Sequence, residues 1–269
     1  MTLSAELIPV DPDAPPADRV NVFIHGYRSM GATRAVEAAR ARVRRTGVAG
    51  ENYLLRWMSG AWADSARFAS LRAAYRAARV PRMLSPWTIL ADAGVVGVHE
   101  AMQYKLMERR ADRVGRSLAA RIARVAGGRP VNLVGHSLGA RVVHACLGSP
   151  DADTLWLHDA VLLAGAADLD AADWPQCVAR LDGRVYNAYS PRDRILWMTP
   201  DLRRRVGNRP LPQIEVLGHA RVINHETHGV NHVQHWTHLS SVLPAVWPEA
   251  SGPPLPGVPR HAGSLPGSV

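Results

Sequence analysis

The sequence has only two cysteines, Cys146 and Cys177, which are too few for a disulfide scaffold. Cys146 follows Val142 and Val143 on a predicted helix, where we expect it to be a small buried hydrophobic side chain. Long apolar runs are missing as well, since no stretch approaches the roughly 18 apolar residues that a membrane span needs. The first residues also lack the basic lead and apolar core of a signal peptide. We therefore expect a soluble cytoplasmic protein without stable membrane insertion.

Acidic residues are outnumbered: 23 Asp and Glu stand against 32 Lys and Arg, which gives a formal net charge of +9. This surplus, nearly all of it arginine, favours contact with anionic partners such as nucleic acid, phospholipid head groups or acidic substrates. The arginines are spread along predicted helices, however, and the densest run, at 203–205, has no DNA- or RNA-binding motif beside it. We interpret that run as a solvated face, and no nucleic-acid partner is expected.

The length of 269 residues and the apolar share of 47% suit one folded α/β domain. Short apolar runs alternate with apolar residues spaced three or four apart, which indicates strands alternating with helices. This alternation predicts a mostly parallel sheet covered by helices on both faces. Strands are predicted at 3–10, 19–24, 53–57, 131–134, 160–164, 185–189 and 214–217, and helices at about 32–45, 111–125, 140–147 and 234–246.

The predicted domain covers residues 1–247, and its pattern changes between residues 60 and 107. Large apolar and small residues mix there without strand alternation, and Pro81 and Pro86 interrupt a helical stretch. We interpret 60–107 as a helical insertion, which either packs as part of the core or forms a lid over a substrate pocket. Residues 248–269 are rich in Pro, Gly and Ser and are predicted to form a disordered tail.

The pattern Gly135-x-Ser137-x-Gly139 lies between a predicted apolar strand, 131–134, and a predicted helix. This context is that of the nucleophile elbow, a tight turn that strains the backbone of the central serine. Glycine is expected at the flanking positions, because a side chain there would collide with neighbouring backbone. The serine hydroxyl is then exposed at a helix N-terminus, where the helix dipole favours developing negative charge. Ser137 is therefore the candidate nucleophile.

A serine nucleophile needs hydrogen-bond donors for the oxyanion of the tetrahedral intermediate. The backbone N–H of Leu138, directly after the nucleophile, is one candidate. The second candidate is the N–H of Tyr27, because His25-Gly26-Tyr27 ends the first strong strand. His25 itself is interpreted as structural, since the base of this mechanism comes late in the chain order serine, acid, histidine.

The catalytic acid is expected on a turn after a strand that follows the elbow, where its carboxylate can orient an imidazole. Asp193 lies in the turn directly after the predicted strand 185–189, and we prefer it for this role. Asp168, which follows the preceding predicted strand, is the alternative. Aspartate is also common in turns for structural reasons alone.

The histidines that could supply the base gather in one short region, with six of them between residues 219 and 238. The base is expected on the loop between the last strand and the last helix. His232 lies just before the last predicted helix and fits best, and His228 is the alternative. His235 and His238 lie within that helix and are expected to pack or face solvent.

The same histidine cluster permits a metal-site hypothesis. His228, His232 and His235 have spacings that could put ligands on one face of a helix. The segment lacks the His-Glu-x-x-His signature, however, and Gly229 argues against a helix there. A metal-dependent hydrolase using this cluster stays an alternative, whereas the serine mechanism needs no metal and no organic cofactor.

The elbow sequence GHSLGAR at 135–141, together with His25-Gly26, resembles the α/β-hydrolases. Three further stretches are similar to one branch of them, the transmembrane and coiled-coil domain hydrolase-like proteins: LLAGA at 162–166, NAYSPRD at 187–193 and NHVQHW at 231–236. The resemblance spans about 20–247 and implies an α/β-hydrolase fold. It also implies that Ser137, Asp193 and His232 are nucleophile, acid and base.

The sequence departs from the broad α/β-hydrolase pattern in two places. Too few residues precede the first strong strand for two full strands, so we expect a shortened sheet. The insertion at 60–107 replaces the usual short crossover. The sequence also lacks the membrane segments of some relatives of the branch.

These residues together favour an acyl-transfer hydrolase that cleaves a carboxylic ester, as an esterase or a lipase-like enzyme. The apolar insertion and the cationic surface favour a small-molecule ester or an anionic lipid as substrate. A non-catalytic binding protein built on a hydrolase scaffold is the alternative from outside the enzymes.

Overall fold

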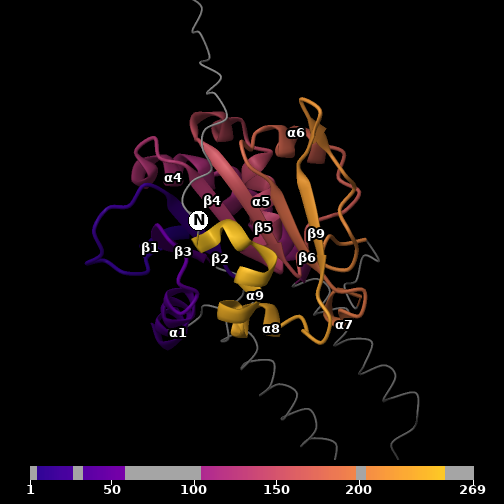
Figure 1. The fold of residues 1–269 in the computed structure, drawn as a ribbon, viewed down its shortest axis with the longest axis horizontal. Helices are drawn as coiled ribbons and strands as arrows, with labels where there is room; N and C mark the ends of the chain where they lie inside the picture. Colours follow the sequence, from indigo (N-terminus) through magenta and orange to yellow (C-terminus); the bar gives the residue numbers. More distant parts are fainter. Residues whose placement is uncertain (1–4, 27–32, 58–103, 198–203, 252–269) are drawn as a thin grey trace, which may run out of the picture.

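The computed structural model describes residues 5–26, 33–57, 104–197 and 204–251. A seven-stranded sheet lies at the centre in the order β1-β3-β2-β4-β5-β6-β9 (Figure 1). Neighbouring strands are parallel except β1 and β3, which pair antiparallel at one edge. The mostly parallel sheet predicted from the sequence is therefore confirmed. The strands are β1 (Ala5–Pro9), β2 (Val20–Ile24), β3 (Glu51–Trp57), β4 (Val131–His136), β5 (Leu157–Leu163), β6 (Val185–Tyr189) and β9 (Val222–Glu226).

The central strands are apolar on both sides because helices cover both faces of the sheet. On β2, Val20, Val22 and Ile24 belong to one hydrophobic core, while Phe23 between them belongs to the other. This is the two-residue period of a strand with a core on each face. All five residues of β2 are buried, and the polar one, Asn21, donates hydrogen bonds to the carbonyl of Ala49 and to Asn52 Oδ1.

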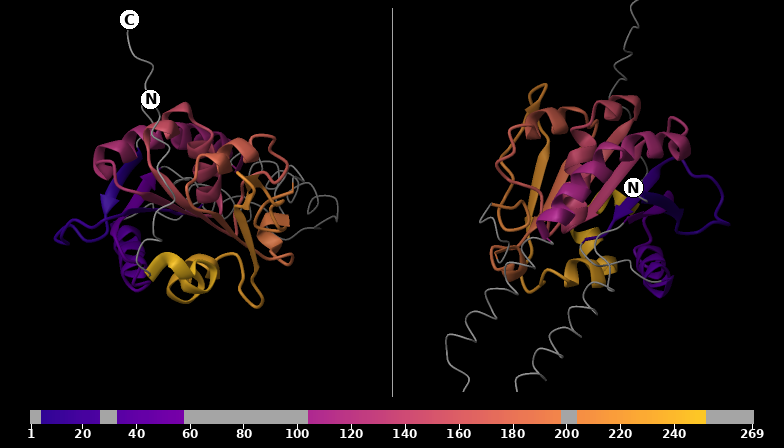
Figure 2. Two further views of the ribbon diagram at one scale, coloured as in Figure 1. Left: turned by 45° about the horizontal axis from the view of Figure 1, so that its top comes forward. Right: turned by 180° about the vertical axis from the view of Figure 1, so that it is seen from behind.

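The helices form two layers, one on each side of the sheet (Figure 2). Helices α1 and α9 contribute to one core, and α4, α5 and α6 contribute to the other together with a helical stretch at 104–116. Among the described residues, no helix combines the length and the hydrophobicity needed to cross a bilayer. The helices are α1 (Thr33–Arg44), α4 (Leu118–Ala126), α5 (Leu138–Leu147), α6 (Trp174–Ala179), α7 (Arg194–Trp197), α8 (Gln234–Thr237) and α9 (Leu239–Val246), with 3-10 helices η1 (Pro150–Thr154) and η2 (Pro248–Ser251).

The prediction of a strand at 214–217 in the main sheet is wrong. Only β7 (Glu215–Val216) forms, and it pairs with β8 (His219–Ala220) in a hairpin outside the main sheet. Leu217 and Gly218 have φ of 53° and 77°, so the chain reverses direction there instead of extending. The last strand of the main sheet is β9, which was not predicted because its residues Val-Ile-Asn-His-Glu are only half apolar.

Two predicted helices are each divided in two. The helix expected at 111–125 breaks at Ser117, whose N–H and hydroxyl both donate to the carbonyl of Val114 in a tight turn. The helix expected at 234–246 breaks at His238, where φ is −107° and ψ is 36°. Apolar spacing continues across both breaks, so periodicity alone does not reveal them.

The predicted domain limits fall partly outside the described residues. Residues 60–103 of the expected insertion lie there, whereas 104–107 belong to the helical stretch 104–116. The expected tail begins too early: Pro248–Ser251 forms η2, and Ala250 is buried. The carbonyl of Ala250 accepts the N–H of Ala49, which ties this end of the chain to the turn before β3. The rest of the expected tail, 252–269, lies outside the described residues.

A buried ion pair joins the helical stretch 104–116 to the segment that begins at residue 204. Arg205 is fully buried, and its Nη2 lies 2.7 Å from Oε1 of Glu108, whose side chain is 5% exposed. Arg205 also donates from Nη1 to the carbonyl of Ala166 at 3.2 Å. On the other side, Lys105 and Arg141 lie 2.9 and 3.4 Å from the same carboxylate. Removing this carboxylate would break the ion pair of a guanidinium that is fully buried in the core.

We expect Glu108→Ala to lower the free energy of unfolding by about 3 kcal/mol, because it breaks a buried ion pair on one side only. Urea denaturation followed by circular dichroism measures the change. The matched control is Glu6→Ala, which breaks the exposed pair between Glu6 and Arg56 and should cost less than about 1 kcal/mol. Equal costs for the two variants would contradict the importance assigned to the buried pair.

Candidate active site

The turn from β4 to α5 has the geometry of a strained elbow. Ser137 has φ 54° and ψ −121°, a conformation that residues with a side chain rarely adopt. A Cβ on Gly139 would lie 2.1 Å from the carbonyl oxygen of Ile24, and one on Gly135 would lie 2.7 Å from backbone of Gly139. The collisions expected from the sequence therefore exist. The strained turn is held by the N–H of Ser137, which donates to the carbonyl of Leu163 at 3.0 Å.

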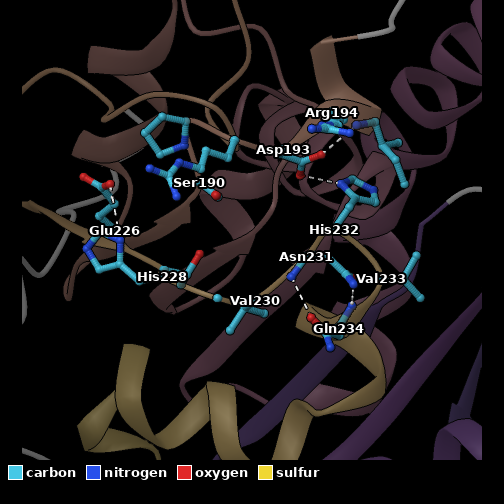
Figure 3. Close-up of a pocket in the computed structure, with 15 residues that line it drawn as sticks. Ser190, Asp193, Arg194, Glu226, His228, Val230, Asn231, His232, Val233 and Gln234 are labelled. Carbon is cyan, nitrogen blue, oxygen red and sulfur yellow. Dashed lines mark hydrogen bonds and ion pairs between the residues drawn. The ribbon is translucent and has the colours of Figure 1, made fainter.

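Three side chains that are far apart in the sequence form one hydrogen-bonded row at this turn. His232 Nε2 lies 2.9 Å from Ser137 Oγ, and His232 Nδ1 lies 2.7 Å from Asp193 Oδ2. Figure 3 shows the second of these contacts. All three residues are buried. A carboxylate on Nδ1 holds the proton there, so that Nε2 is the nitrogen that can accept the serine proton.

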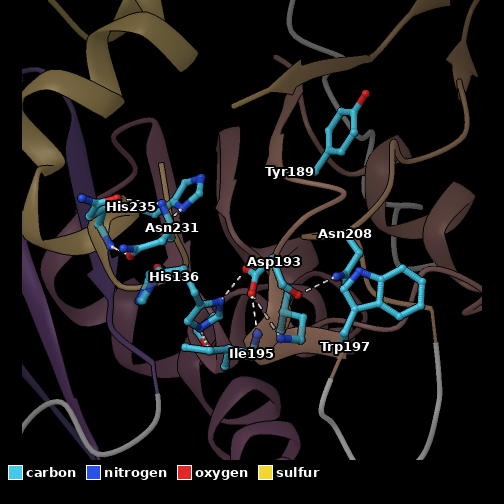
Figure 4. Close-up of polar contacts among 12 residues, drawn as sticks. His136, Tyr189, Asp193, Ile195, Trp197, Asn208, Asn231 and His235 are labelled. Carbon is cyan, nitrogen blue, oxygen red and sulfur yellow. Dashed lines mark hydrogen bonds and ion pairs between the residues drawn. The ribbon is translucent and has the colours of Figure 1, made fainter. Parts of the chain in front are cut away.

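Asp193 is fixed on both of its oxygens. While Oδ2 faces His232, Oδ1 accepts the backbone N–H groups of Ile195 at 3.0 Å and Leu196 at 3.2 Å. The carboxylate therefore caps the short helix α7. The backbone carbonyl of Asp193 accepts a hydrogen bond from Asn208 Nδ2 at 3.2 Å (Figure 4). These bonds hold the carboxylate in the orientation that the row needs.

The alternative candidates lie apart from the row. Asp168 accepts the N–H of Asp170 at 3.1 Å in the loop after β5. His228 is exposed, with Nδ1 3.6 Å from Glu226, and Figure 3 shows this pair well separated from Asp193. His235 is buried, but its nitrogens contact the hydroxyl of Thr227 and the carbonyl of Asn231 at 2.9 and 3.0 Å. It stabilises the loop that carries His232.

The metal-site hypothesis for the histidine cluster finds no support in this geometry. Both ring nitrogens of His232 and both of His235 have other partners, and His228 faces Glu226 in solvent. Helical spacing does not apply, because Gly229 has φ 73° and the segment before α8 is a turn. In the described residues, the nitrogens of the cluster do not meet at one point.

The space beside Ser137 is bounded by two backbone segments that the sequence had already indicated. Leu138 is the first residue of α5, and the N–H groups of a first helical turn have no acceptor within the helix. A Cβ on Gly26 would lie 2.6 Å from Ser137 Cβ, so the end of β2 passes directly against the serine. Tyr27, the other expected oxyanion donor, lies outside the described residues.

His25 is fully buried beside this segment. Its Nδ1–H donates to the carbonyl of Gly26 at 2.9 Å, and its own carbonyl accepts Trp57 Nε1 at 3.2 Å. Burial lowers the pKa of His25 to about 4, so the ring is neutral at pH 7. These contacts agree with a structural role.

His136, the residue before the serine, contacts the histidine of the row, and it was not among the predicted site residues. Its Nε2–H donates to the backbone carbonyl of His232 at 2.9 Å, and its ring stacks on Trp236. Burial lowers the pKa of His136 well below its ordinary value, so this ring is neutral as well. Its position inside the elbow marks it as close to Ser137, but nothing in the sequence indicates a partner 96 residues away.

An open hollow of about 850 Å³ lies next to the row, between the turn after β6 and the loop before α8 (Figure 3). Its volume is within the range of small-molecule sites. Asp193 and His232 belong to its wall, whereas Ser137 does not line it. Ile195 and Val233 give it an apolar border, since both are about half exposed.

Comparison with known families shows a match over the later part of the domain. Residues 94–247, more than half of its length, match the family described as "Protein of unknown function (DUF726)". The chain belongs to this family. The matched range begins before the helical stretch 104–116 and includes Ser137, Asp193 and His232.

Two relatives of this DUF726 chain carry names that refer to membranes. It is 37% identical over 94 residues to "Transmembrane and coiled-coil domain-containing protein STS1" of Oryza sativa subsp. japonica. It is 31% identical over 147 residues to "Uncharacterized membrane protein F35D11.3" of Caenorhabditis elegans. The resemblance to the transmembrane and coiled-coil branch is thereby confirmed. The aligned parts are 34% and 51% of this chain, but only 14% and 23% of the relatives, so the chain spans less than a quarter of their length.

Two solved structures resemble the chain at low sequence identity and low TM-score. The esterase domain of a Rhodothermus marinus protein is 13% identical, with a TM-score of 0.39 over 90% of this chain and 97% of that one. LpqC, a poly(3-hydroxybutyrate) depolymerase from Bordetella parapertussis, is 16% identical, with a TM-score of 0.41 over 91% and 90%. The assignment to the α/β-hydrolase fold depends on the molecule's own features: the parallel sheet between two helical layers, and the elbow between β4 and α5.

We expect the free energy of unfolding to fall as the pH drops from 7 to 5, because His25 is buried in its neutral form. Its folded-state pKa of about 4 lies below the ordinary value of 6.5, so the unfolded chain binds the proton more readily. This stabilisation is complete above about pH 6.5 and is lost toward pH 4. The loss from His25 alone is about 2 kcal/mol between pH 7 and pH 5.

Urea denaturation at pH 7, 6 and 5 measures this slope. His25→Gln should reduce it, whereas the control His219→Gln should leave it unchanged, since His219 is exposed on β8. A wild-type stability that is flat across this range would contradict burial of a neutral His25.

Proposed function

We propose that the protein is a serine hydrolase that cleaves carboxylic esters. In this proposal Ser137 is the nucleophile, His232 the general base and Asp193 the carboxylate that orients His232. The observation that supports it best is the buried row of contacts, 2.9 Å from Ser137 Oγ to His232 Nε2 and 2.7 Å from His232 Nδ1 to Asp193. The row ends on a strained elbow, where a nucleophile is presented to substrate.

The first half of the proposed reaction forms an acyl-enzyme. Ser137 Oγ attacks the ester carbonyl while its proton moves to His232 Nε2. Asp193 stays ionised and stabilises the imidazolium. The tetrahedral intermediate collapses as His232 gives the proton to the leaving alkoxide, and the alcohol departs. In the second half, water attacks the acyl group, its proton moves to His232, and the acid leaves as Ser137 regains the proton.

The oxyanion of each tetrahedral intermediate is proposed to accept hydrogen bonds from the N–H of Leu138 and the N–H of Tyr27. Leu138 supports this role by its place at the start of α5, where the helix dipole adds to the N–H group. Loss of one such donor typically costs about 3–4 kcal/mol of transition-state stabilisation. No step of this mechanism requires a metal or an organic cofactor.

The substrate is proposed to be a small-molecule ester or a lipid. The apolar border formed by Ile195 and Val233 suits an acyl chain. Arg192 and Arg194, exposed in the same wall of the hollow, suit an anionic group on the substrate. The cytoplasmic location expected from the sequence stays a prediction beside this proposal.

We expect a fluorophosphonate probe to label the wild-type protein covalently and Ser137→Ala not at all, because the probe reacts with an activated serine hydroxyl. Mass spectrometry of the intact protein and of its peptides measures the adduct. The control is Ser241→Ala, which removes an exposed serine hydroxyl on α9 and should leave labelling unchanged. Well-folded wild-type protein that takes up no probe would favour the alternative of a non-catalytic binding protein.

We expect His232→Ala to abolish hydrolysis of a short-chain p-nitrophenyl ester, because no other nitrogen contacts Ser137 Oγ in the described residues. Asp193→Asn should lower kcat about 10⁴-fold by favouring the wrong tautomer of His232. His228→Ala should retain turnover, since His228 is exposed and faces Glu226. His235→Ala should retain turnover at reduced stability. Activity that survives in His232→Ala but not in His228→Ala would refute the assignment of the base.

A further inference from the structure

A second group of side chains with metal-ligand chemistry lies outside the serine site. His144, Asp173 and Cys177 each offer one ligand atom, and these atoms all lie within 4.8 Å of one another. They come from two helices, α5 and the start of α6. In the described residues, this is the one place where His, Cys, Asp or Glu side chains converge in this way. The proposed serine mechanism gives these three residues no role, and the family match assigns them none.

Local structure explains why the three ligands meet. Asp173 and Cys177 are four residues apart around the first turn of α6, where the N–H of Cys177 donates to the carbonyl of Asp173 at 2.9 Å. This spacing puts both side chains on one face of the turn. His144 lies on the last turn of α5 against that face, and its ring is 4.3 Å from the ring of Trp174.

One pair of these atoms already has the spacing of two ligands on one ion, and the sulfur lies within 4.8 Å of both. His144 Nε2 lies 3.1 Å from Asp173 Oδ1. Two ligands at tetrahedral positions around Zn²⁺, each about 2.0–2.1 Å from the ion, are about 3.3 Å apart. Nε2 is buried, and the polar group beside it is this carboxylate.

The thiol of Cys177 completes a mixed set of donors. It is buried, and it donates a weak hydrogen bond to the carbonyl of His144 at 3.8 Å. A nitrogen, a carboxylate oxygen and a sulfur together are ligands that suit Zn²⁺ better than Mg²⁺ or Ca²⁺.

A hollow of about 390 Å³ opens beside two of these ligands, His144 and Asp173, and four further charged side chains border it. Two of the four are cationic, Arg116 and Arg141, but Arg141 is already held by two bonds to Asp112. The remaining carboxylate is that of Asp168. The hollow is therefore not a cationic surface that would repel Zn²⁺, and it leaves room for water as a fourth ligand.

We propose that His144, Asp173 and Cys177 form a Zn²⁺ site that joins α6 to α5. His144 Nε2, one oxygen of Asp173 and the sulfur of Cys177 bind the ion, and water takes the fourth position. On binding, the thiol releases its proton to solvent and the S–Zn bond forms, so affinity rises with pH. The site lies seven residues from Ser137 along α5, which is about 10 Å at 1.5 Å per residue, and it is separate from the serine chemistry.

Zinc binding to the folded chain stabilises it, because the ligands are together only in that state. Untagged protein, stripped with a chelator and dialysed, is titrated with zinc chloride by calorimetry, and bound zinc is counted by elemental analysis. We expect one equivalent bound and a Tm about 5 °C higher at roughly 100-fold over Kd. Co²⁺ in place of zinc should give the near-ultraviolet charge-transfer band of a thiolate ligand.

Cys177→Ser and Asp173→Asn should each weaken zinc binding at least about 10-fold and reduce the rise in Tm at the same zinc concentration to about half or less. Asp173 is half exposed, so its variant tests the site even if the buried cysteine variant fails to fold. The matched control Cys146→Ala removes the other buried cysteine, and it should bind zinc as the wild type does. No zinc bound to the wild type would overturn the proposal. So would binding that survives in Asp173→Asn and is lost in His228→Gln, which would place the ion at the C-terminal histidines.

Discussion

Helix α5 packs so closely against the end of β2 that no side chain fits at Gly139. The helix can begin there only if the chain leaves β4 through a turn with positive φ, and the residue that takes this conformation is Ser137. The cost of that strained backbone, of order 1–3 kcal/mol, is offset by the bonds and the packing that hold the turn. The position of the serine hydroxyl is thus a consequence of how tightly a helix and a strand approach each other.

The parallel sheet then brings the other two members of the row to the same place. Asp193 follows β6 and His232 follows β9, and both of these strands run parallel to β4. Their carboxyl ends lie at one edge of the sheet, where ligands bind in open α/β folds. Each residue also has a local structural role, since Asp193 caps α7 and His232 lies at the turn into α8. The local turns therefore orient these two side chains toward the place where the parallel strands end.

Sequence reasoning found the elements whose signals are local. The elbow has its glycines, strand and helix within residues 131–147, and the chain order of serine, acid and histidine pointed to Asp193 and His232. It missed β9, because an edge strand with the sequence Val-Ile-Asn-His-Glu has neither an apolar run nor strict alternation. It also placed a strand at 214–217, where two residues of positive φ make a hairpin turn that apolar content cannot predict.

Contacts between distant segments could not be predicted at all. The bond from His136 to the carbonyl of His232 depends on a separation of 96 residues and on how the loop before α8 returns to β4. The meeting of His144 with Asp173 and Cys177 depends likewise on how α6 packs against α5. In both cases the residue types were visible in the sequence, but the partner was decided by tertiary packing.

The bond from His136 has a mechanical consequence. Ser137 is covalently joined to His136, and His136 donates a hydrogen bond to the backbone carbonyl of His232. The ring of His232 in turn contacts Ser137 Oγ. Serine and histidine thus close a small loop of one peptide bond and two hydrogen bonds. A displacement of the elbow carries the imidazole with it, and a displacement of the loop that carries His232 pulls on the elbow. The distance between the two reacting atoms therefore depends on contacts within this small loop as well as on the packing around it.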